Sequence, residues 1–241
     1  MYYCALLHDN SLINMHPVAY KYLEEIMNVI AINGSPRKKW NTAAMLENVL
    51  SGAASKGAKT ELIHLYDYDY KGCHSCFACK TKDGKSYGRC AVRDGITPVL
   101  EKIYDEADAF VLGTPFYFGT MTGMMRSFTE RLMFPYLVYA MPPVSLFPRK
   151  IKTAFVYTMN VGEDHFKEVN YPVHIGGNEW VLGRIFGEPA ESLMAFATKQ
   201  FDDYSKYVFS MGDPVERVKN AEKTLPEDCK KAYELGVRLI G

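Results

Sequence analysis

Apolar residues along this chain follow two alternating patterns. Short runs of Val, Ile, Phe and Leu bounded by turn residues predict buried strands, whereas apolar residues three or four positions apart predict amphipathic helices. The predicted strands are residues 29–32, 60–66, 109–112, 153–158 and 193–197. The predicted helices are residues 43–55, 96–107 with Asp94 as N-cap, 121–132, 178–186 and 215–241, the last broken or kinked near Pro226. Segments 67–93, 135–149 and 159–177 show no periodicity and are predicted to be irregular.

Five strands interleaved with helices predict an α/β fold with a doubly wound parallel sheet. In the flavodoxin-like strand order 2-1-3-4-5, the order reverses between strands one and three, and ligands bind beyond the carboxyl ends of the strands at that point. The two most unusual loops of the chain, 33–42 and 113–120, directly follow these two strands. We therefore expect the functional site between them.

Length, charge and cysteine placement narrow the class of protein. The 241 residues suit one domain, predicted at 27–241, after an N-terminal extension at 1–26 that includes a helix at 16–26. The formal net charge is zero and 23% of residues are charged, which argues against nucleic acid and anionic membranes as partners. No apolar run approaches the ~20 residues that a membrane span requires. Because no secretory segment precedes the clustered cysteines, we expect a cytoplasmic protein.

The first loop has the composition of a phosphate site. A strand that ends in a turn rich in Gly, Ser, Asn and Thr and then opens a helix presents backbone N–H groups at the positive end of the helix dipole. The loop lacks Gly-Lys-Ser/Thr and has one Gly, so it matches neither a triphosphate loop nor a dinucleotide fingerprint. We predict one phosphate, bound by Ser35, Asn41 and Thr42 with Arg37 as a charged partner. The alternative is an ordinary capped surface turn.

The second loop offers surfaces for a flat ring. It contains three aromatic residues, and a Gly that permits close approach, in the run Pro115, Phe116, Tyr117, Phe118 and Gly119. The end of strand four adds a third wall with amide donors, formed by Thr158, Met159 and Asn160. One phosphate attached to a planar conjugated ring describes FMN. The alternative for Phe116 and Phe118 is packing beneath the loop.

These motifs resemble the NADPH-dependent FMN reductase family of flavodoxin-like proteins. The resemblance covers residues 28–160 and rests on Gly34-Ser35-Pro36-Arg37, Asn41-Thr42, the run 113–119 and the pair Arg126 and Arg131. It implies an oxidoreductase with NAD(P)H as co-substrate. It also implies that Ser35, Arg37, Asn41 and Thr42 bind the FMN phosphate, that residues 115–119 flank the isoalloxazine, and that residues 158–160 complete the site. Family members form dimers or tetramers, so a homodimer or homotetramer is expected.

Four of the six cysteines are clustered in the segment 67–93. Cys73, Cys76 and Cys79 have the spacing that lets three thiolates face one cubane cluster, and Cys90 is the candidate fourth ligand. This run places the chain closest to iron-sulfur flavoproteins, in which the fourth cysteine follows sooner than it does here. A [4Fe-4S] cluster, a zinc ion bound by four thiolates and reduced cysteines without a metal remain the three alternatives.

Two redox functions and one binding function follow from these features. The first hypothesis is an FMN-dependent enzyme that takes hydride from NAD(P)H and reduces a quinone, a free flavin or a similar small-molecule acceptor. The second is an electron carrier between protein partners that contains FMN and a [4Fe-4S] cluster. The third is a zinc-binding protein without redox activity. The neutral charge argues against a carrier, since shuttles of this fold use strong charge to steer partners.

Overall fold

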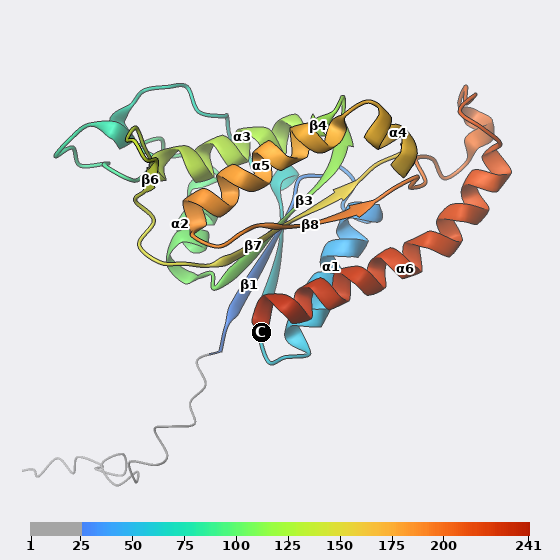
Figure 1. Cartoon of the computed structure of the whole chain (residues 1–241), viewed down its shortest axis with the longest axis horizontal. Coiled ribbons are helices and arrows are strands. Elements are labelled where there is room, and N and C mark those ends of the chain that lie inside the picture. Colours follow the sequence, from blue (N-terminus) through green and yellow to red (C-terminus); the bar gives the residue numbers. More distant parts are fainter. Residues whose placement is uncertain (1–25) are drawn as a thin grey trace, which may run out of the picture.

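A computed structural model describes residues 26–241 (Figure 1), so the predicted extension, apart from residue 26, lies outside the described part of the chain. The strands are β1 (Asn28–Asn33), β2 (Lys59–His64), β3 (Ala109–Tyr117), β4 (Thr120–Met121), β5 (Leu137–Val138), β6 (Val144–Ser145), β7 (Lys152–Thr158) and β8 (Glu191–Ala195). The helices are α1 (Asn41–Ala54), α2 (Thr97–Glu106), α3 (Gly123–Met133), α4 (Glu163–Glu168), α5 (Tyr171–Phe186) and α6 (Pro214–Ile240).

The central sheet has the strand order β2-β1-β3-β7-β8, with all neighbours along this path parallel. This is the predicted flavodoxin-like order 2-1-3-4-5, with β7 and β8 as strands four and five. The register pairs Asn33 with Gly113 and Pro115 with Thr158. The carboxyl ends of β1, β3 and β7, and the loops that follow them, therefore lie side by side.

Side chains of the central strands alternate between two apolar layers, as a sheet covered on both faces requires. On one face, Ile30, Phe110 and Phe155 pack with residues of α2, α3 and α5. On the other face, Val29, Val111 and their neighbours pack with residues of α1 and α6. Figure 1 shows this three-layer arrangement, with α1 and α6 together below the sheet.

Helices α1 and α6 approach most closely near the C-terminus of the chain. A Cβ atom added to Gly236 would lie 1.9 Å from the carbonyl oxygen of Val49, and one added to Gly52 would lie 2.0 Å from that of Tyr233. Only glycine permits such backbone contact between helices. The N-terminal half of α6 extends away from α1 (Figure 1), so the two helices form a wedge.

Several predicted boundaries were wrong. The predicted loop 113–120 is largely a hairpin, because β3 continues to Tyr117 and turns back to pair with β4. The segment 135–149 contains the short pair β5 and β6. The segment 159–177 contains α4 and the start of α5. Pro172 lies in the first turn of α5, where its missing N–H costs nothing, while Gly176 and Gly177 weakened the helical signal in the sequence.

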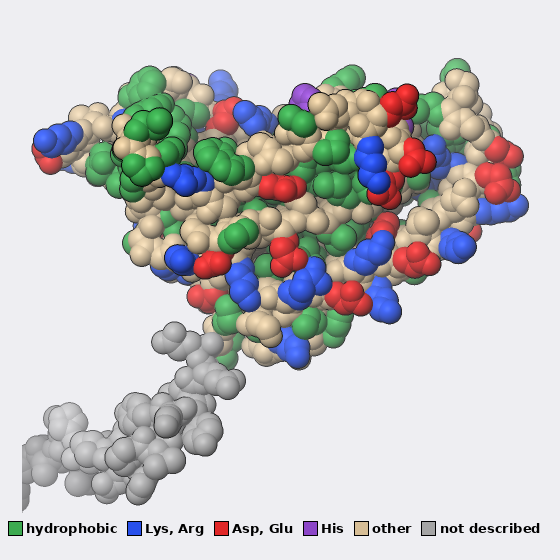
Figure 2. All heavy atoms as spheres, viewed as in Figure 1, with side chains coloured by type: hydrophobic (Ala, Val, Ile, Leu, Met, Phe, Trp, Pro, Cys, Tyr) green, Lys and Arg blue, Asp and Glu red, His purple; other side chains and the backbone are tan. Residues whose placement is uncertain are grey.

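Two predictions about helix ends also need correction. Ile96, not Asp94, occupies the N-cap position of α2. The Asp94 carboxylate accepts hydrogen bonds from Arg131 and from the Thr97 hydroxyl instead. Helix α6 is not broken at Pro226, which lies inside it, while the predicted kink at this residue stays a prediction. Among residues 26–241, no helix combines the length and the apolar character needed to cross a bilayer. Figure 2 shows basic and acidic side chains interspersed over one face, as the zero net charge predicts.

Candidate functional site

The N-terminus of α1 carries backbone donors that the described structure leaves uncapped. Trp40, at the N-cap position, has an extended backbone and makes no side-chain cap bond. The N–H groups of a first helical turn have no intrahelical acceptor. In α1 this turn is buried, since Asn41, Thr42 and Ala43 are each at most 9% exposed. Buried N–H groups at the positive end of a 14-residue helix fit an anion.

The loop before α1 is shaped by its own side chains. The Oδ1 atom of Asn33 accepts a hydrogen bond from the Ser35 N–H at 2.9 Å, and the Ser35 Oγ accepts one from the Arg37 N–H at 3.1 Å. The Asn33 Nδ2 lies 2.9 Å from the His64 Nδ1 on β2. Asn33 was missed as a site residue in the sequence analysis, although an Asn before Gly is a common turn former.

The predicted phosphate ligands have different surroundings. Ser35 and Thr42 are buried in the loop, and the Thr42 Oγ1 lies 2.7 Å from the Thr158 Oγ1 at the end of β7. The structure therefore brings the first and third parts of the predicted site together. The side chain of Asn41 donates instead to the Lys199 carbonyl at 2.9 Å. The Arg37 guanidinium donates to the Gln200 carbonyl and lies 5.1 Å from the Trp40 ring centroid.

The aromatic residues of the second loop divide into one half-buried and two exposed rings. Phe116 packs edge-on against Tyr171 and Tyr157, with centroid distances of 5.1 and 6.2 Å. This agrees with the alternative interpretation that the ring packs beneath the loop. Tyr117 is partly exposed, and Phe118 is fully exposed with a left-handed backbone at φ 50°. Gly119 has φ 83°, a conformation that its lack of a Cβ permits.

The third wall is less open than predicted. The Met159 N–H donates to the Ala195 carbonyl, and the Met159 carbonyl accepts from Thr198, both at 2.9 Å. Met159 therefore has no free backbone donor for a ligand. Asn160 is different, because its buried Oδ1 has no hydrogen-bond partner within the described residues. An orphan acceptor of this kind fits a ligand that donates a hydrogen bond, such as a hydroxyl or a ring N–H.

A second threonine, missed in the sequence analysis, connects the loops. The Thr122 hydroxyl donates to the Gly34 carbonyl at 2.8 Å and accepts from the Met125 N–H at 3.2 Å, so it also caps α3. The Thr122 N–H donates to the Thr114 Oγ1 at 3.1 Å. The loop 33–42 is thus fixed to the start of α3 by buried hydrogen bonds. A Thr three residues before a helical apolar position was the available signal.

The four clustered cysteines surround one small space. Cys73, Cys76, Cys79 and Cys90 all line a cavity of about 20 Å³ next to α3. Ser75 and Phe77, between the first three cysteines, have left-handed backbones at φ 55° and 57°. Lys80 donates to the carbonyls of Phe134, Pro135 and Leu137 and so fixes this segment to the end of α3. Burial raises the pKa of the Cys79 thiol, and the Lys80 charge opposes the rise.

A buried arginine lies behind this cavity. Arg131 is 2% exposed; its Nη1 lies 2.8 Å from the Asp94 carboxylate and its Nε donates to the Cys90 Sγ at 3.0 Å. Burial alone would raise the pKa of Asp94, but the hydrogen bond and charge of Arg131 lower it overall. Among residues 26–241, no three His, Cys, Asp or Glu side chains converge as ligands of a single ion would. A [4Fe-4S] cluster, a zinc ion and reduced cysteines without a metal therefore stay the three alternatives for these four cysteines.

Comparison with known proteins agrees with the predicted family. The sequence profile of a family described as NADPH-dependent FMN reductase matches residues 27–159, more than half of the chain. An iron-sulfur flavoprotein of Archaeoglobus fulgidus is 44% identical over 105 residues, which are 44% of this chain and 48% of that protein. One from Methanocaldococcus jannaschii is 35% identical over 105 residues, 44% of this chain and 51% of that protein. The chain spans about half the length of the curated relatives it matches.

Solved structures agree with the fold. An NAD(P)H:quinone oxidoreductase from Methanothermobacter marburgensis has a TM-score of 0.65 and 12% identity, and the match covers 89% of this chain and 99% of that one. An FMN-dependent NADH-azoreductase from Bacillus anthracis, determined in complex with FMN, has a TM-score of 0.59 and 15% identity, and the match covers 90% and 100%. At these identities the likeness establishes the flavodoxin-like fold alone, which confirms the predicted fold class.

Proposed function

This chain belongs to the NADPH-dependent FMN reductase family, and from that premise we propose that it binds FMN and oxidises NAD(P)H. Electrons would pass to a small-molecule acceptor such as a quinone or a free flavin. One observation carries the proposal. The N-terminus of α1 is buried and has no side-chain cap, and it lies at the carboxyl edge of the sheet where the strand order reverses.

The phosphate of FMN would be held by the first turn of α1. Its backbone N–H groups supply donors, and the hydroxyls of Ser35 and Thr42 add two more from buried positions. The side chains of Arg37 and Asn41 bond the carbonyls of Gln200 and Lys199. We therefore assign Arg37 a contribution through its charge and Asn41 one through its backbone N–H.

The ring would lie between the second loop and the end of β7. Pro115 is in register with Thr158, so these two parts of the proposed site lie on neighbouring strands. The orphan Oδ1 of Asn160 is available to accept a hydrogen bond from the ligand. When bound, FMN supplies the redox chemistry through its isoalloxazine. The chain's own residues orient the ring, and the exposed Phe118 would cover it or contact a second copy of the chain in a homodimer or homotetramer.

Comparison of FMN with riboflavin tests this function directly. Riboflavin has the same ring and ribityl chain but lacks the phosphate. We expect the full-length apo protein to bind FMN at least about 100-fold more tightly, which corresponds to about 2.7 kcal/mol. Quenching of flavin fluorescence measures both affinities. The FMN-loaded protein should then consume NADPH or NADH in the presence of a quinone. Equal affinities for the two flavins would contradict the phosphate site.

A second function, electron transfer through FMN and a [4Fe-4S] cluster, is favoured by the cysteine cavity. All four thiols line the same space, and left-handed residues within such a loop turn backbone N–H groups toward an anion. The donor set therefore fits a cluster by its chemistry. The cavity of about 20 Å³ holds roughly one water molecule, so the segment 73–90 would have to move outward to accommodate the cluster.

Iron and sulfide analysis after anaerobic purification tests this second function. We expect a Cys79→Ser variant to lose most of the iron, because one of the four proposed ligands is removed. Cys229→Ser is the matched control, since Cys229 is a half-buried cysteine on α6 outside the cavity. Full iron content in the Cys79→Ser variant would contradict the proposed ligation, and so would a wild-type protein without iron.

A further inference from the structure

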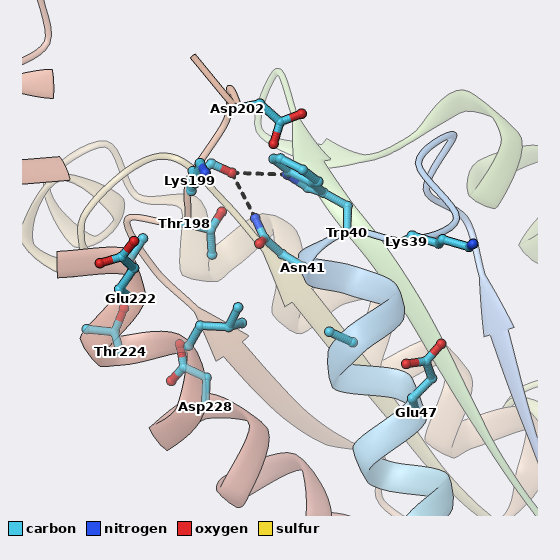
Figure 3. Close-up of a pocket in the computed structure, with 13 residues that line it drawn as sticks. Lys39, Trp40, Asn41, Glu47, Thr198, Lys199, Asp202, Glu222, Thr224 and Asp228 are labelled. Carbon is cyan, nitrogen blue, oxygen red and sulfur yellow. Dashed lines mark hydrogen bonds between the residues drawn. The ribbon is translucent and has the colours of Figure 1, made fainter. Parts of the chain in front are cut away.

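The wedge between α1 and α6 contains a cavity of about 570 Å³ (Figure 3). It lies between the first turns of α1, the N-terminal half of α6 and the segment 198–202. Its volume is within the range of about 300–1,000 Å³ that small-molecule sites occupy. The close packing at Gly52 and Gly236 fixes the narrow end of the wedge, so the opening is a feature of the helix packing.

The cavity is distinct from the proposed FMN site, although both use the start of α1. The backbone N–H groups of the first turn are directed along the helix axis, beyond its N-terminus. In contrast, the side chains of Trp40 and Asn41 face the segment 198–202, where both donate to the Lys199 carbonyl at 3.1 and 2.9 Å. Figure 3 shows both bonds at the upper rim of the cavity.

The lining combines an apolar interior with an excess of acidic groups. Ala44, Ala221 and Leu225 supply aliphatic surface, and the Trp40 ring supplies a flat wall. A cation already lies near that ring, because the Lys199 Nζ is 5.9 Å from its centroid. The charged lining residues comprise four carboxylates and two lysines, namely Glu47, Asp202, Glu222, Asp228, Lys39 and Lys199.

Asp228 is the group whose environment indicates the ligand. It is 7% exposed, yet its described partner Lys231 has a side chain that is 58% exposed and an Nζ at 3.4 Å from one carboxylate oxygen. Burial raises the pKa of Asp228, and Lys231 opposes the rise only in part. A buried carboxylate with one weak partner is costly in its charged form. A cation inside the cavity would reduce that cost.

We propose that this cavity binds a compact organic cation, an ammonium group on an apolar body, with the Asp228 carboxylate as its counter-charge. The apolar body would contact Ala44, Leu225 and the Trp40 ring. Simple metal cations lack a body that fills the apolar interior, and organic anions would face the acidic excess. The proposal does not depend on FMN binding, because the residues it uses are outside the phosphate cradle.

Three probes of the same shape and different charge test the proposal by isothermal titration calorimetry on the full chain. They are 2-phenylethylammonium, 2-phenylethanol and phenylacetate. We expect the ammonium compound to bind at least tenfold more tightly than either of the others. Asp228→Asn should reduce its affinity at least tenfold. Glu227→Gln is the matched control, because Glu227 is an exposed carboxylate next to Asp228 that does not line the cavity.

A second variant keeps the test valid if Asp228→Asn fails to fold. Ala44→Leu adds volume to the cavity from the α1 side without changing its charge, and it should abolish binding of the ammonium probe. Equal affinity for the ammonium and carboxylate probes would overturn the proposal. Equal effects of Asp228→Asn and Glu227→Gln, or unchanged binding in Ala44→Leu, would also overturn it. The FMN affinity measured in parallel reports separately on the proposed function.

Discussion

Replacement of Asp94 by alanine should lower the free energy of unfolding by about 3–5 kcal/mol, the usual cost of leaving a buried charge without its partner. The Arg131 side chain is 2% exposed and has Asp94 as its carboxylate partner. Its other acceptors are the Cys90 sulfur and the carbonyls of Lys71 and Val92, none of which is a carboxylate. In the variant, the guanidinium would remain buried without a counter-charge.

Urea denaturation followed by circular dichroism measures this loss. The matched control is Glu101→Ala, which removes the acidic partner of Arg93 from an ion pair whose side chains are both largely exposed. Exposed pairs contribute about 0–1 kcal/mol, so the control should be close to wild type. Similar losses in the two variants would show that the buried pair has no special role.

The difference in the free energy of unfolding between wild type and Asp94→Ala should depend on pH in a defined direction. Because Arg131 lowers the pKa of Asp94 in the folded state, the contribution of the pair is complete above the unfolded pKa of about 3.9. This stabilising contribution is lost as the pH falls through the lower pKa that Asp94 has in the folded state. The stability gap between wild type and Asp94→Ala should therefore narrow below about pH 4.

The fold could be predicted because its strands are buried on both faces. Continuous apolar runs of the kind in β1, β3 and β7 are a strong signal, and their alternation with amphipathic helices limits the topology to few choices. The prediction that residues 159–177 are irregular was wrong for a local reason. Gly176 and Gly177 have low helix propensity, and α5 is held by tertiary contacts of residues such as Ile175 and Leu182 with the core.

The candidate site was predictable where its residues are contiguous in sequence. The loop 33–42 could be identified as a candidate phosphate site from one strand–turn–helix pattern. The family resemblance needed the run 113–119 and the arginines of the following helix as well, and the family match confirms the class that these motifs predicted, NAD(P)H-dependent FMN oxidoreductases. The pairs Thr122–Gly34 and Arg131–Asp94 could not be identified, because their members are 88 and 37 residues apart. Such pairs depend on how α3 packs against the sheet, which no local pattern records.

The difference between local patterns and distant contacts also explains why the predictions for the second loop, residues 113–120, were only partly right. Its composition predicted flat surfaces, but which ring faces a ligand depends on strand register and on distant partners. Phe116 points into a cluster with Tyr157 and Tyr171, whereas Phe118 is exposed by a left-handed turn. Composition alone therefore predicted that this loop offers flat surfaces, and it did not predict the role of each ring.

The double variant Ser35→Ala/Thr42→Ala should lose most of the FMN affinity. Hydrogen bonds to a charged phosphate contribute about 1–3 kcal/mol each, so the combined loss is expected at about 2–6 kcal/mol if the two effects add. Both hydroxyls are buried at the start of α1, where water replaces them poorly. Fluorescence titration of the apo protein with FMN measures the change.

Two controls separate loss of phosphate binding from a general loss of structure. Ser51→Ala removes a hydroxyl further along α1 that bonds the Glu47 carbonyl, and it should leave FMN affinity unchanged. Riboflavin should bind the double variant as weakly as it binds wild type, because its contacts do not include a phosphate. If the double variant retained wild-type FMN affinity, or if riboflavin binding fell in parallel, the hydroxyls of Ser35 and Thr42 would not be phosphate ligands.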